Sequence, residues 1–280
     1  MNGDDFRIRT MSPAEIPLAA DWAAAEGWNP GLADAGCFGC VDPAGFLIGE
    51  YAGQPASTIS VVNYDERFAF LGFYIVRPDL RGRGFGLRTW RAGIAHAGTR
   101  TIGLDGVVAQ QDNYRKSGFA FAYKNIRYSG IPVNLRRTEE TVPLSAVPFE
   151  LIERDDATVF PAARPVLLQN WIAAPGHAGR ALLRGGRLVA WGVIRPCRHG
   201  RKVGPLFADD RAAAEAVLAA LVGKESGEIF LDAPEPNKAA VSLAESHGLA
   251  PVFQTARMYS GPIRPVALER VFGVKTFELG

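Results

Sequence analysis

The chain has 280 residues, of which 48% are hydrophobic and 21% are charged, and its formal net charge is +2 at pH 7. This composition predicts one large or two medium globular domains. So small a charge creates no field that draws nucleic acid or an anionic membrane, and no apolar run approaches the roughly 18 residues of a spanning helix. We therefore expect neither nucleic acid nor a membrane among its partners.

The cysteines give little sign of special chemistry. Three cysteines cannot form a disulfide framework, and the N-terminus lacks the apolar core of a signal peptide. Cys37 and Cys40 have the spacing of half a zinc site, but no second Cys/His pair at zinc spacing accompanies them. We expect reduced cysteines in a cytoplasmic protein with no bound metal, and metal or redox chemistry is the weaker alternative.

The first half alternates between strand and helix patterns. The β-branched and aromatic run 68–76 predicts a buried strand, and Pro78 ends it because proline has no N–H to donate. An apolar-periodic segment, 84–97, then predicts a helix. In chain order we expect a strand at 6–10, a helix from Ser12 to Gly27, strands at 46–50, 57–62 and 68–76, a helix at 84–97, a strand at 101–106, a short helix at 110–117 and a strand at 119–128.

After a polar, proline-bearing stretch the pattern starts again. The segment Ile102–Asp105 matches Ile229–Asp232, and Ala122–Tyr128 matches Phe253–Tyr259, which indicates an internal repeat. The tail 266–280 would add a hairpin or an edge strand. The expected elements of the second half are a helix at 161–172, strands at 180–184, 188–195 and 202–207, a helix at 211–222, a strand at 228–232, a helix at 236–247 and a strand at 251–259. We predict domains at 1–135 and 149–280, joined by a linker at 136–148.

The run Arg81–Gly86 separates the strand at 68–76 from the helix that follows. Glycines let a backbone turn sharply, and the unpaired N–H groups of a helix start, aided by the helix dipole, bind phosphate. Leu87 and Arg88 stand where a Walker loop needs lysine and serine or threonine, so a nucleotide-dependent phosphotransferase is disfavoured. A glycine-rich turn without a ligand is the alternative for this run alone.

Further motifs extend this pattern to a known family. The spacing Arg-x-x-Gly-x-Gly after Pro78 resembles the pyrophosphate loop of the GNAT superfamily of acetyl-CoA-dependent acyltransferases. Tyr114-x-Lys-x-Gly-Phe119 resembles the motif that follows the last helix of these enzymes, and Leu104-Asp105 with Gln110 resembles their Leu-Glu-x-x-x-x-Asn stretch. Only four positions separate Gln110 from Tyr114, against seven in the family, a deletion close to one helical turn. The resemblance covers about residues 6–128 well and 149–260 loosely.

The resemblance implies a fold and an activity. The expected fold is α/β (α+β), with tandem GNAT-like domains that each contain a mixed, mostly antiparallel twisted sheet flanked by helices. The expected activity is transfer of an acetyl group from the cosubstrate acetyl-CoA to a primary amine of a small molecule, by direct transfer in a ternary complex and without a metal. A non-catalytic acyl-CoA-binding regulatory module is the alternative, and a homodimer is possible.

The resemblance also assigns roles to residues. Tyr114 would protonate the departing thiolate, and Asp105 would be the general base, although a carboxylate that merely caps the strand end explains Asp105 equally well. Glu50, Asp65 and Glu66 are alternative bases. The expected cofactor-binding residues are Tyr74, Ile75, Val76, Arg81, Gly82, Arg83, Gly84, Phe85, Gly86, Gln110 and Tyr114. The candidate acceptor-binding residues are Trp28, Asn29, Tyr64 and Tyr123.

The second half lacks these features. Its equivalent of the glycine loop is Gly204–Asp210, which has no Arg-x-x-Gly-x-Gly pattern and places two carboxylates where they would repel phosphate. Ala244 stands at the position of the tyrosine. We therefore expect a degenerate domain that does not bind CoA. The basic run 195–202 is either a solvated hairpin or an attraction for an anionic partner, the former being favoured.

Overall fold

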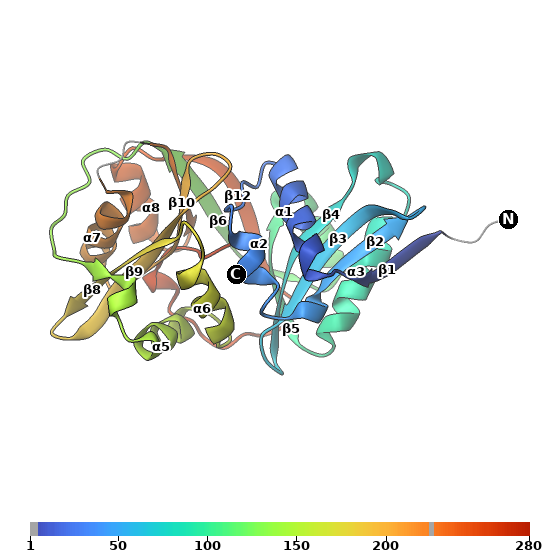
Figure 1. Ribbon diagram of the computed structural model, residues 1–280, viewed down its shortest axis with the longest axis horizontal. Helices are drawn as coiled ribbons and strands as arrows, with labels where there is room; N and C mark the ends of the chain where they lie inside the picture. The colour runs from blue at the N-terminus through green and yellow to red at the C-terminus, as the bar shows by residue number, and fades with distance from the viewer. Residues whose placement is uncertain (1–4, 224–226) are drawn as a thin grey trace.

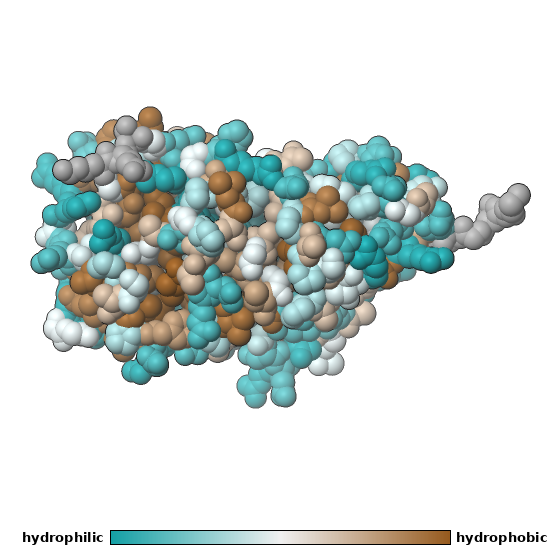
Figure 2. Space-filling model, in the orientation of Figure 1, coloured by the Kyte–Doolittle hydropathy of each residue, from teal (hydrophilic) through white to brown (hydrophobic). Residues whose placement is uncertain are grey.

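The computed structural model describes residues 5–223 and 227–280. Two lobes lie side by side, with helices packed on a sheet that passes from one lobe to the other (Figure 1). In the view of Figure 2, hydrophilic side chains dominate the lobe formed by the first half, at right, and hydrophobic ones gather more over the other lobe. The tandem α/β plan expected from the sequence is confirmed.

The first lobe follows the predicted order of elements closely. A short helix, α2, was not expected. The elements are β1 (Phe6–Thr10), α1 (Ile16–Ala25), α2 (Asp34–Phe38), β2 (Phe46–Tyr51), β3 (Gln54–Asn63), β4 (Phe68–Val76), α3 (Phe85–Ala97), β5 (Thr101–Val107), α4 (Gln111–Lys116) and β6 (Ala120–Gly130).

The second lobe repeats the order and adds a helix, α5, before the predicted one. The expected helix at 161–172 is found as α6, which begins four residues later at a proline. The elements are β7 (Val142–Pro143), α5 (Phe149–Val159), α6 (Pro165–Ala173), β8 (Ala178–Arg184), β9 (Arg187–Pro196), β10 (Arg201–Ala208), α7 (Arg211–Val222), β11 (Ile229–Pro234), α8 (Lys238–Ser246), β12 (Ala250–Tyr259) and β13 (Val271–Gly273).

The two halves exchange their last strands. In the described residues the order across the sheet is β1-β2-β3-β4-β5-β12-β6-β11-β10-β9-β8-β7. Thus β12, from the second half, pairs with β5, whereas β6, from the first half, pairs with β11. Each half therefore completes the sheet of the other.

Two buried ion pairs join the exchanged strands, β12 and β6, to the strands beside them. Asp105 on β5 lies opposite Arg257 on β12, and Arg257 Nη2 is 2.6 Å from Asp105 Oδ2. Asp232 on β11 lies opposite Arg127 on β6, with 2.6 Å between Arg127 Nε and Asp232 Oδ1. Both guanidinium groups donate to both oxygens of their carboxylate. The repeat seen in the sequence thus reappears as a pair of equivalent contacts between the halves.

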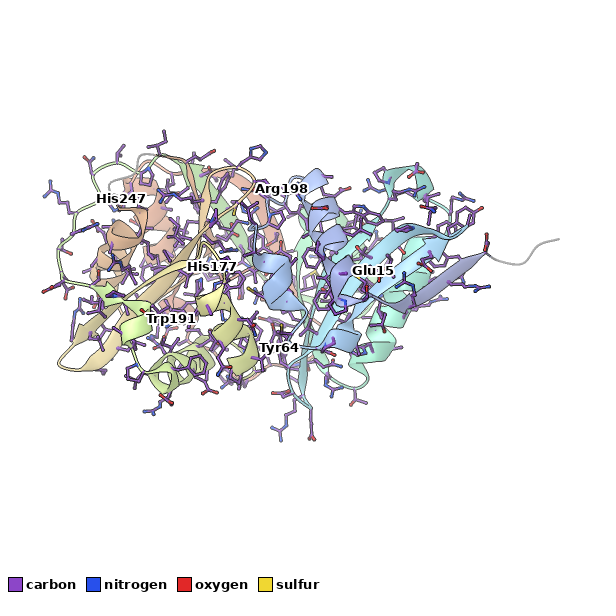
Figure 3. All side chains as sticks on the ribbon, viewed as in Figure 1. Glu15, Tyr64, His177, Trp191, Arg198 and His247 are labelled. Carbon is purple, nitrogen blue, oxygen red and sulfur yellow. The ribbon has the colours of Figure 1, made fainter. Side chains whose placement is uncertain are left out.

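The C-terminal tail lies inside the molecule. Residues 271–280 are all buried, and β13 pairs with β10 rather than adding the edge strand or hairpin that the alternating pattern predicts. Beyond β13, Lys275 is 3.1 Å from Asp156, which also binds Arg164. Tyr64, labelled in Figure 3, donates to the Leu279 carbonyl at 2.7 Å, and Arg164 donates to the backbone oxygen of Gly280. The prediction was wrong because both sides of this segment are covered, whereas an edge strand leaves one side open.

His177, also labelled in Figure 3, gives the second lobe a pH-sensitive point. Its ring packs against Trp171, and burial lowers the pKa of the imidazole to about 4. His177 takes up a proton below about pH 6.5 in the unfolded chain, but only below about pH 4 in the folded protein. We expect the stability to fall as the pH decreases through this window, and His177→Gln to flatten that slope in urea titrations. The exposed His199→Gln is the control, and an unchanged slope in His177→Gln would contradict the assignment.

Candidate active site

The first lobe opens where β4 and β5 separate. Their parallel pairing extends only from Phe68–Leu71 against Thr101–Leu104. At the same point β4 bulges, because one residue of β3, Ile59, faces two of β4, Phe73 and Tyr74, and Phe73 takes a positive φ of 47°. The hydroxyl of Thr58 holds the bulge by donating to the Phe73 carbonyl at 2.7 Å. One edge of β4 beyond Leu71 therefore faces an open wedge instead of a strand.

A cavity of about 470 Å³ occupies this wedge. It extends from the start of α3, along the free edge of β4, to side chains of β12 and of the C-terminal tail. Its walls are formed by Glu26, Trp28, Leu71, Gly72, Phe73, Tyr74, Ile75, Val76, Leu80, Arg81, Gly82, Gly84, Gly86, Leu87, Leu104, Asp105, Gly106, Val107, Gln110, Tyr114, Phe253, Thr255, Phe277 and Glu278.

The glycine run forms the turn into α3 at one end of the cavity. Gly84 precedes the helix with a φ of +81°, which L side chains rarely adopt. The first backbone bond of the helix joins the Arg88 N–H to the Gly84 carbonyl, so the N–H groups before it have no acceptor within the helix. At Gly86 a β-carbon would lie 2.8 Å from the Tyr74 hydroxyl. The chain therefore approaches β4 closely and presents unpaired N–H groups, which is the geometry that binds an anionic oxygen.

Arg81 lies at the mouth of the cavity. Its Nε donates to the Val76 carbonyl at 3.0 Å, and its guanidinium forms an ion pair with Glu26. The side chain is half exposed. Arg81 borders the same cavity as the start of α3, so its positive charge would complement a phosphate bound there. Arg83 and Phe85, in contrast, do not line the cavity, because Arg83 covers the Tyr51 ring and Phe85 stacks on Phe6.

Tyr114 lies on α4 and faces the cavity. Its ring packs on Gly106, where any β-carbon would collide with it, and stacks on Trp90 at a centroid distance of 5.6 Å. Burial, with a smaller effect of Tyr74, raises the pKa of the phenol to about 12. The hydroxyl is therefore protonated at neutral pH and has a proton to donate. The shorter spacing after Gln110 still leaves both residues on the cavity wall.

Asp105 also borders the cavity, but its carboxylate is engaged. Both oxygens accept from Arg257, and Asn125 Nδ2 donates to Oδ1 at 2.7 Å. The equivalent Asp232 is bound in the same way by Arg127. This arrangement favours the structural explanation that the sequence left open over the role of general base. The alternative acids Glu50, Asp65 and Glu66 do not line the cavity.

Of the candidate acceptor-binding residues, only Trp28 borders the cavity. The Asn29 amide binds the backbone of His199, and the Tyr64 hydroxyl is used by the Leu279 carbonyl. The ring of Tyr123 lies beneath the Arg257 guanidinium. The interpretation of these three aromatic and polar residues as pocket residues is therefore not supported, since their side chains are used in packing elsewhere.

Four residues of the second half reach the cavity, and the sequence did not predict them. They arrive by the strand exchange and by the buried tail, and neither leaves a local signal in the sequence. They are Phe253, Thr255, Phe277 and Glu278.

The corresponding wedge of the second half is closed. Parallel pairing of β10 with β11 ends at Val203 and Leu231, and β13 then pairs with β10 beyond that point. At the start of α7, Asp210 accepts from the Ala213 N–H at 2.7 Å. The segment that corresponds to the cavity is thus filled by the chain itself, and the helix start is capped by a carboxylate. The solvated hairpin expected for the basic run is wrong for its two ends, because Arg195 binds Asp34 and Lys202 donates to the Asn29 carbonyl inside the protein, whereas Arg198 and His199 are exposed.

Two negative findings apply to the described residues only. No group of three or more His, Cys, Asp and Glu side chains is placed to hold a metal ion. No helix there is long and apolar enough to cross a membrane.

A strand bulge and a pair of parallel strands that separate, present in outline in each half, together with the glycine-led helix start of the first half, define the class of fold. Residues 15–119 match the family model described as "Acetyltransferase (GNAT) family", and residues 152–273 match the one described as "Acetyltransferase (GNAT) domain". The chain belongs to the GNAT superfamily of acyltransferases, with two GNAT domains in tandem.

Similar proteins extend over nearly the whole chain. A curated relative, the holothin acyltransferase of Pseudoalteromonas sp. (strain SANK 73390), is 29% identical over 277 residues, which cover 97% of this chain and 94% of the relative. A putative acetyltransferase from Pyrococcus horikoshii has a TM-score of 0.86 at 22% identity, covering 100% of this chain and 98% of that one. A tandem GNAT protein from the clavulanic acid biosynthesis pathway has a TM-score of 0.62 at 13% identity, over 92% and 99% of the two chains. Because both of these solved structures are less than 25% identical to this chain, they show that it shares their fold.

Proposed function

We propose that this protein is an N-acetyltransferase that transfers the acetyl group of acetyl-CoA to a primary amine of a small molecule, by direct transfer in a ternary complex. The observation that carries the proposal is a cavity that joins an anion-binding helix start, the free edge of β4 and a protonated tyrosine. The relative that acylates holothin supports acyl transfer to a small molecule.

The residues present fit the cosubstrate. The N–H groups at the start of α3, together with Arg81, suit a pyrophosphate, and the lack of a side chain at Gly86 lets the helix start lie close to Tyr74 on β4. The cosubstrate supplies an activated thioester. Backbone N–H groups on the open edge of β4, between Gly72 and Val76, stabilise the negative charge that develops on the thioester oxygen.

Two protons must move in the reaction. A solvated alkyl ammonium has a pKa near 10.4 and cannot attack until it loses a proton. The thiolate leaves more readily when it receives one, and the Tyr114 phenol, buried on the cavity wall, is placed to give it. The second half, whose wedge is filled by β13, takes no CoA in this proposal.

Titration with acetyl-CoA tests the proposal. We expect calorimetric binding of one equivalent and release of free thiol when primary amines are added. Binding without turnover across a broad amine panel would favour the non-catalytic acyl-CoA-binding module. No binding at millimolar acetyl-CoA would overturn both.

Tyr114→Phe tests the proton donor. We expect kcat to fall about 100-fold, the lower end of what a positioned acid contributes. The affinity for acetyl-CoA should stay within about twofold, because the ring and its stacking on Trp90 are retained. Stopped assays of thiol release and calorimetry measure the two quantities. Tyr128→Phe, in the core of the second lobe, is the matched control. An unchanged kcat in Tyr114→Phe would remove Tyr114 from this role.

A further inference from the structure

Among the residues that the structure describes, three carboxylates border the cavity, and two of them are paired with guanidinium groups. Glu26 is paired with Arg81, and Asp105 is paired with Arg257. The third, Glu278, is only 3% exposed, and its Oε1 has no hydrogen-bond partner among the described residues. A buried polar atom without a partner is costly in a native protein and calls for an explanation, such as a ligand.

Glu278 is held firmly beside the reaction site. Its other oxygen, Oε2, accepts from the Thr276 hydroxyl, and its own N–H donates to that hydroxyl at 3.1 Å. A β-carbon at Gly72 would collide with the Glu278 backbone oxygen, so the tail lies directly against the bulge of β4. Both Gly72 and Glu278 border the cavity. Glu278 therefore lies next to the edge of β4 on which the thioester oxygen is proposed to lie.

Aromatic rings and two buried cations surround Glu278. Arg127 and Lys202 both interact electrostatically with it, although Arg127 is bonded to Asp232 and Lys202 to the Asn29 carbonyl. Trp28, Phe253 and Phe277 border the same cavity. A second buried atom without a partner, the Thr255 hydroxyl oxygen, is found there too, and Thr255 is 2% exposed. The carboxylate oxygen Oε1 of Glu278 and the Thr255 hydroxyl, which both lack a hydrogen-bond partner among the described residues, would recognise a molecule with a single positive charge, an apolar body and one further polar group.

We propose that Glu278 binds the ammonium group of the acceptor and takes its proton, and that the acceptor is a compact, largely apolar primary amine. This inference rests on the proposed function and names the base and the substrate class for the same cavity. It also gives the second half a role, because the tail that closes its own wedge carries Glu278 into the cavity of the first half.

The proton and electron movements balance. Glu278 Oε1 accepts one proton from the ammonium, and the freed nitrogen lone pair forms the C–N bond as the thioester C–S bond breaks. The thiolate takes the proton of Tyr114, and the resulting phenolate recovers a proton from the new amide nitrogen. Glu278 then releases its proton to water, so that ammonium and thioester yield amide, thiol and one proton.

The charges on the cavity wall separate this acceptor class from others. A polyamine or an aminoglycoside would bring several positive charges to a wall that offers one carboxylate without a partner. An amino acid would bring a carboxylate, and Arg81, the guanidinium among the described lining residues, is already assigned to the pyrophosphate of the cosubstrate. Burying an unpaired charge is costly, so these acceptors should be poor substrates.

Glu278→Gln tests the proposal with acetyl-CoA as donor and 2-phenylethylamine as the acceptor probe, against spermidine and glycine. We expect wild type to prefer 2-phenylethylamine, and Glu278→Gln to lose about 100-fold in kcat/KM for it, the scale of general base catalysis. Glu278→Gln should also bind the amine more weakly by calorimetry in the presence of CoA. Glu269→Gln, an exposed acid earlier in the same tail, is the matched control.

The readouts separate this inference from the proposed function. The affinity of Glu278→Gln for acetyl-CoA and its melting temperature should match wild type, since glutamine keeps the shape of the side chain. If wild type fails to bind acetyl-CoA, the proposed function fails. If wild type binds acetyl-CoA but neither binds nor acetylates 2-phenylethylamine, or prefers spermidine or glycine, the substrate class is wrong. If Glu278→Gln keeps wild-type kcat/KM and amine affinity, Glu278 is not the base.

Discussion

Gly84→Glu is expected to reduce the binding of acetyl-CoA below detection at millimolar ligand. Gly84 has a φ of +81°, and a side chain in that conformation costs about 1–2 kcal/mol. The added carboxylate would also lie beside the unpaired N–H groups of α3, where it would compete with a phosphate and repel it. Both effects act at the helix start and leave the aromatic end of the cavity intact.

Gly185→Glu is the matched control for this change. Gly185 also has a positive φ, +58°, and a β-carbon added there would meet open space, but it lies in the turn between β8 and β9. The same charge and similar backbone strain are thus placed in the other lobe. Calorimetry with acetyl-CoA and thermal melting compare the two variants. Equal affinity in Gly84→Glu and Gly185→Glu would show that the cosubstrate does not use this helix start.

The strand, turn and helix start that we propose for phosphate binding could be located from the sequence because their determinants are local. The run that forms β4 is continuous and apolar, Pro78 stops it, and the glycines precede a periodic helix. The observed bounds of β4 agree with the prediction, and α3 begins one residue later than expected. Tyr114 was found in the same way, from a motif that spans six residues.

The acceptor side could not be predicted because its residues come from distant parts of the chain. The repeats place β6 and β12 at equivalent positions, so no local pattern indicates that each strand pairs in the other half. Glu278 is separated from Gly72 by most of the chain, and the alternating pattern around it is typical of an exposed strand. Tyr64 and Tyr123 were assigned to the pocket by residue type alone. Neither borders the cavity, because Tyr64 donates to the Leu279 carbonyl and the Tyr123 ring lies against Arg257.

Asp105→Asn and Asp232→Asn are expected to lose similar amounts of stability, about 3–5 kcal/mol each. Each change removes the carboxylate from a buried guanidinium, Arg257 in one case and Arg127 in the other, and leaves that positive charge without its partner. The two sites are equivalent in the repeat, but only Asp105 borders the cavity. Asp232 therefore serves as an internal control for a purely structural role.

Urea unfolding gives the free energy of each variant, and Asp112→Asn supplies the surface reference. Asp112 is paired with Arg115 on an exposed face, so its loss should cost less than about 1 kcal/mol. If Asp105 acts only in the ion pair, the kcat of the folded Asp105→Asn variant should fall far less than the kcat of Glu278→Gln. Wild-type stability in Asp105→Asn, combined with a loss of kcat as large as that of Glu278→Gln, would return the role of base to Asp105.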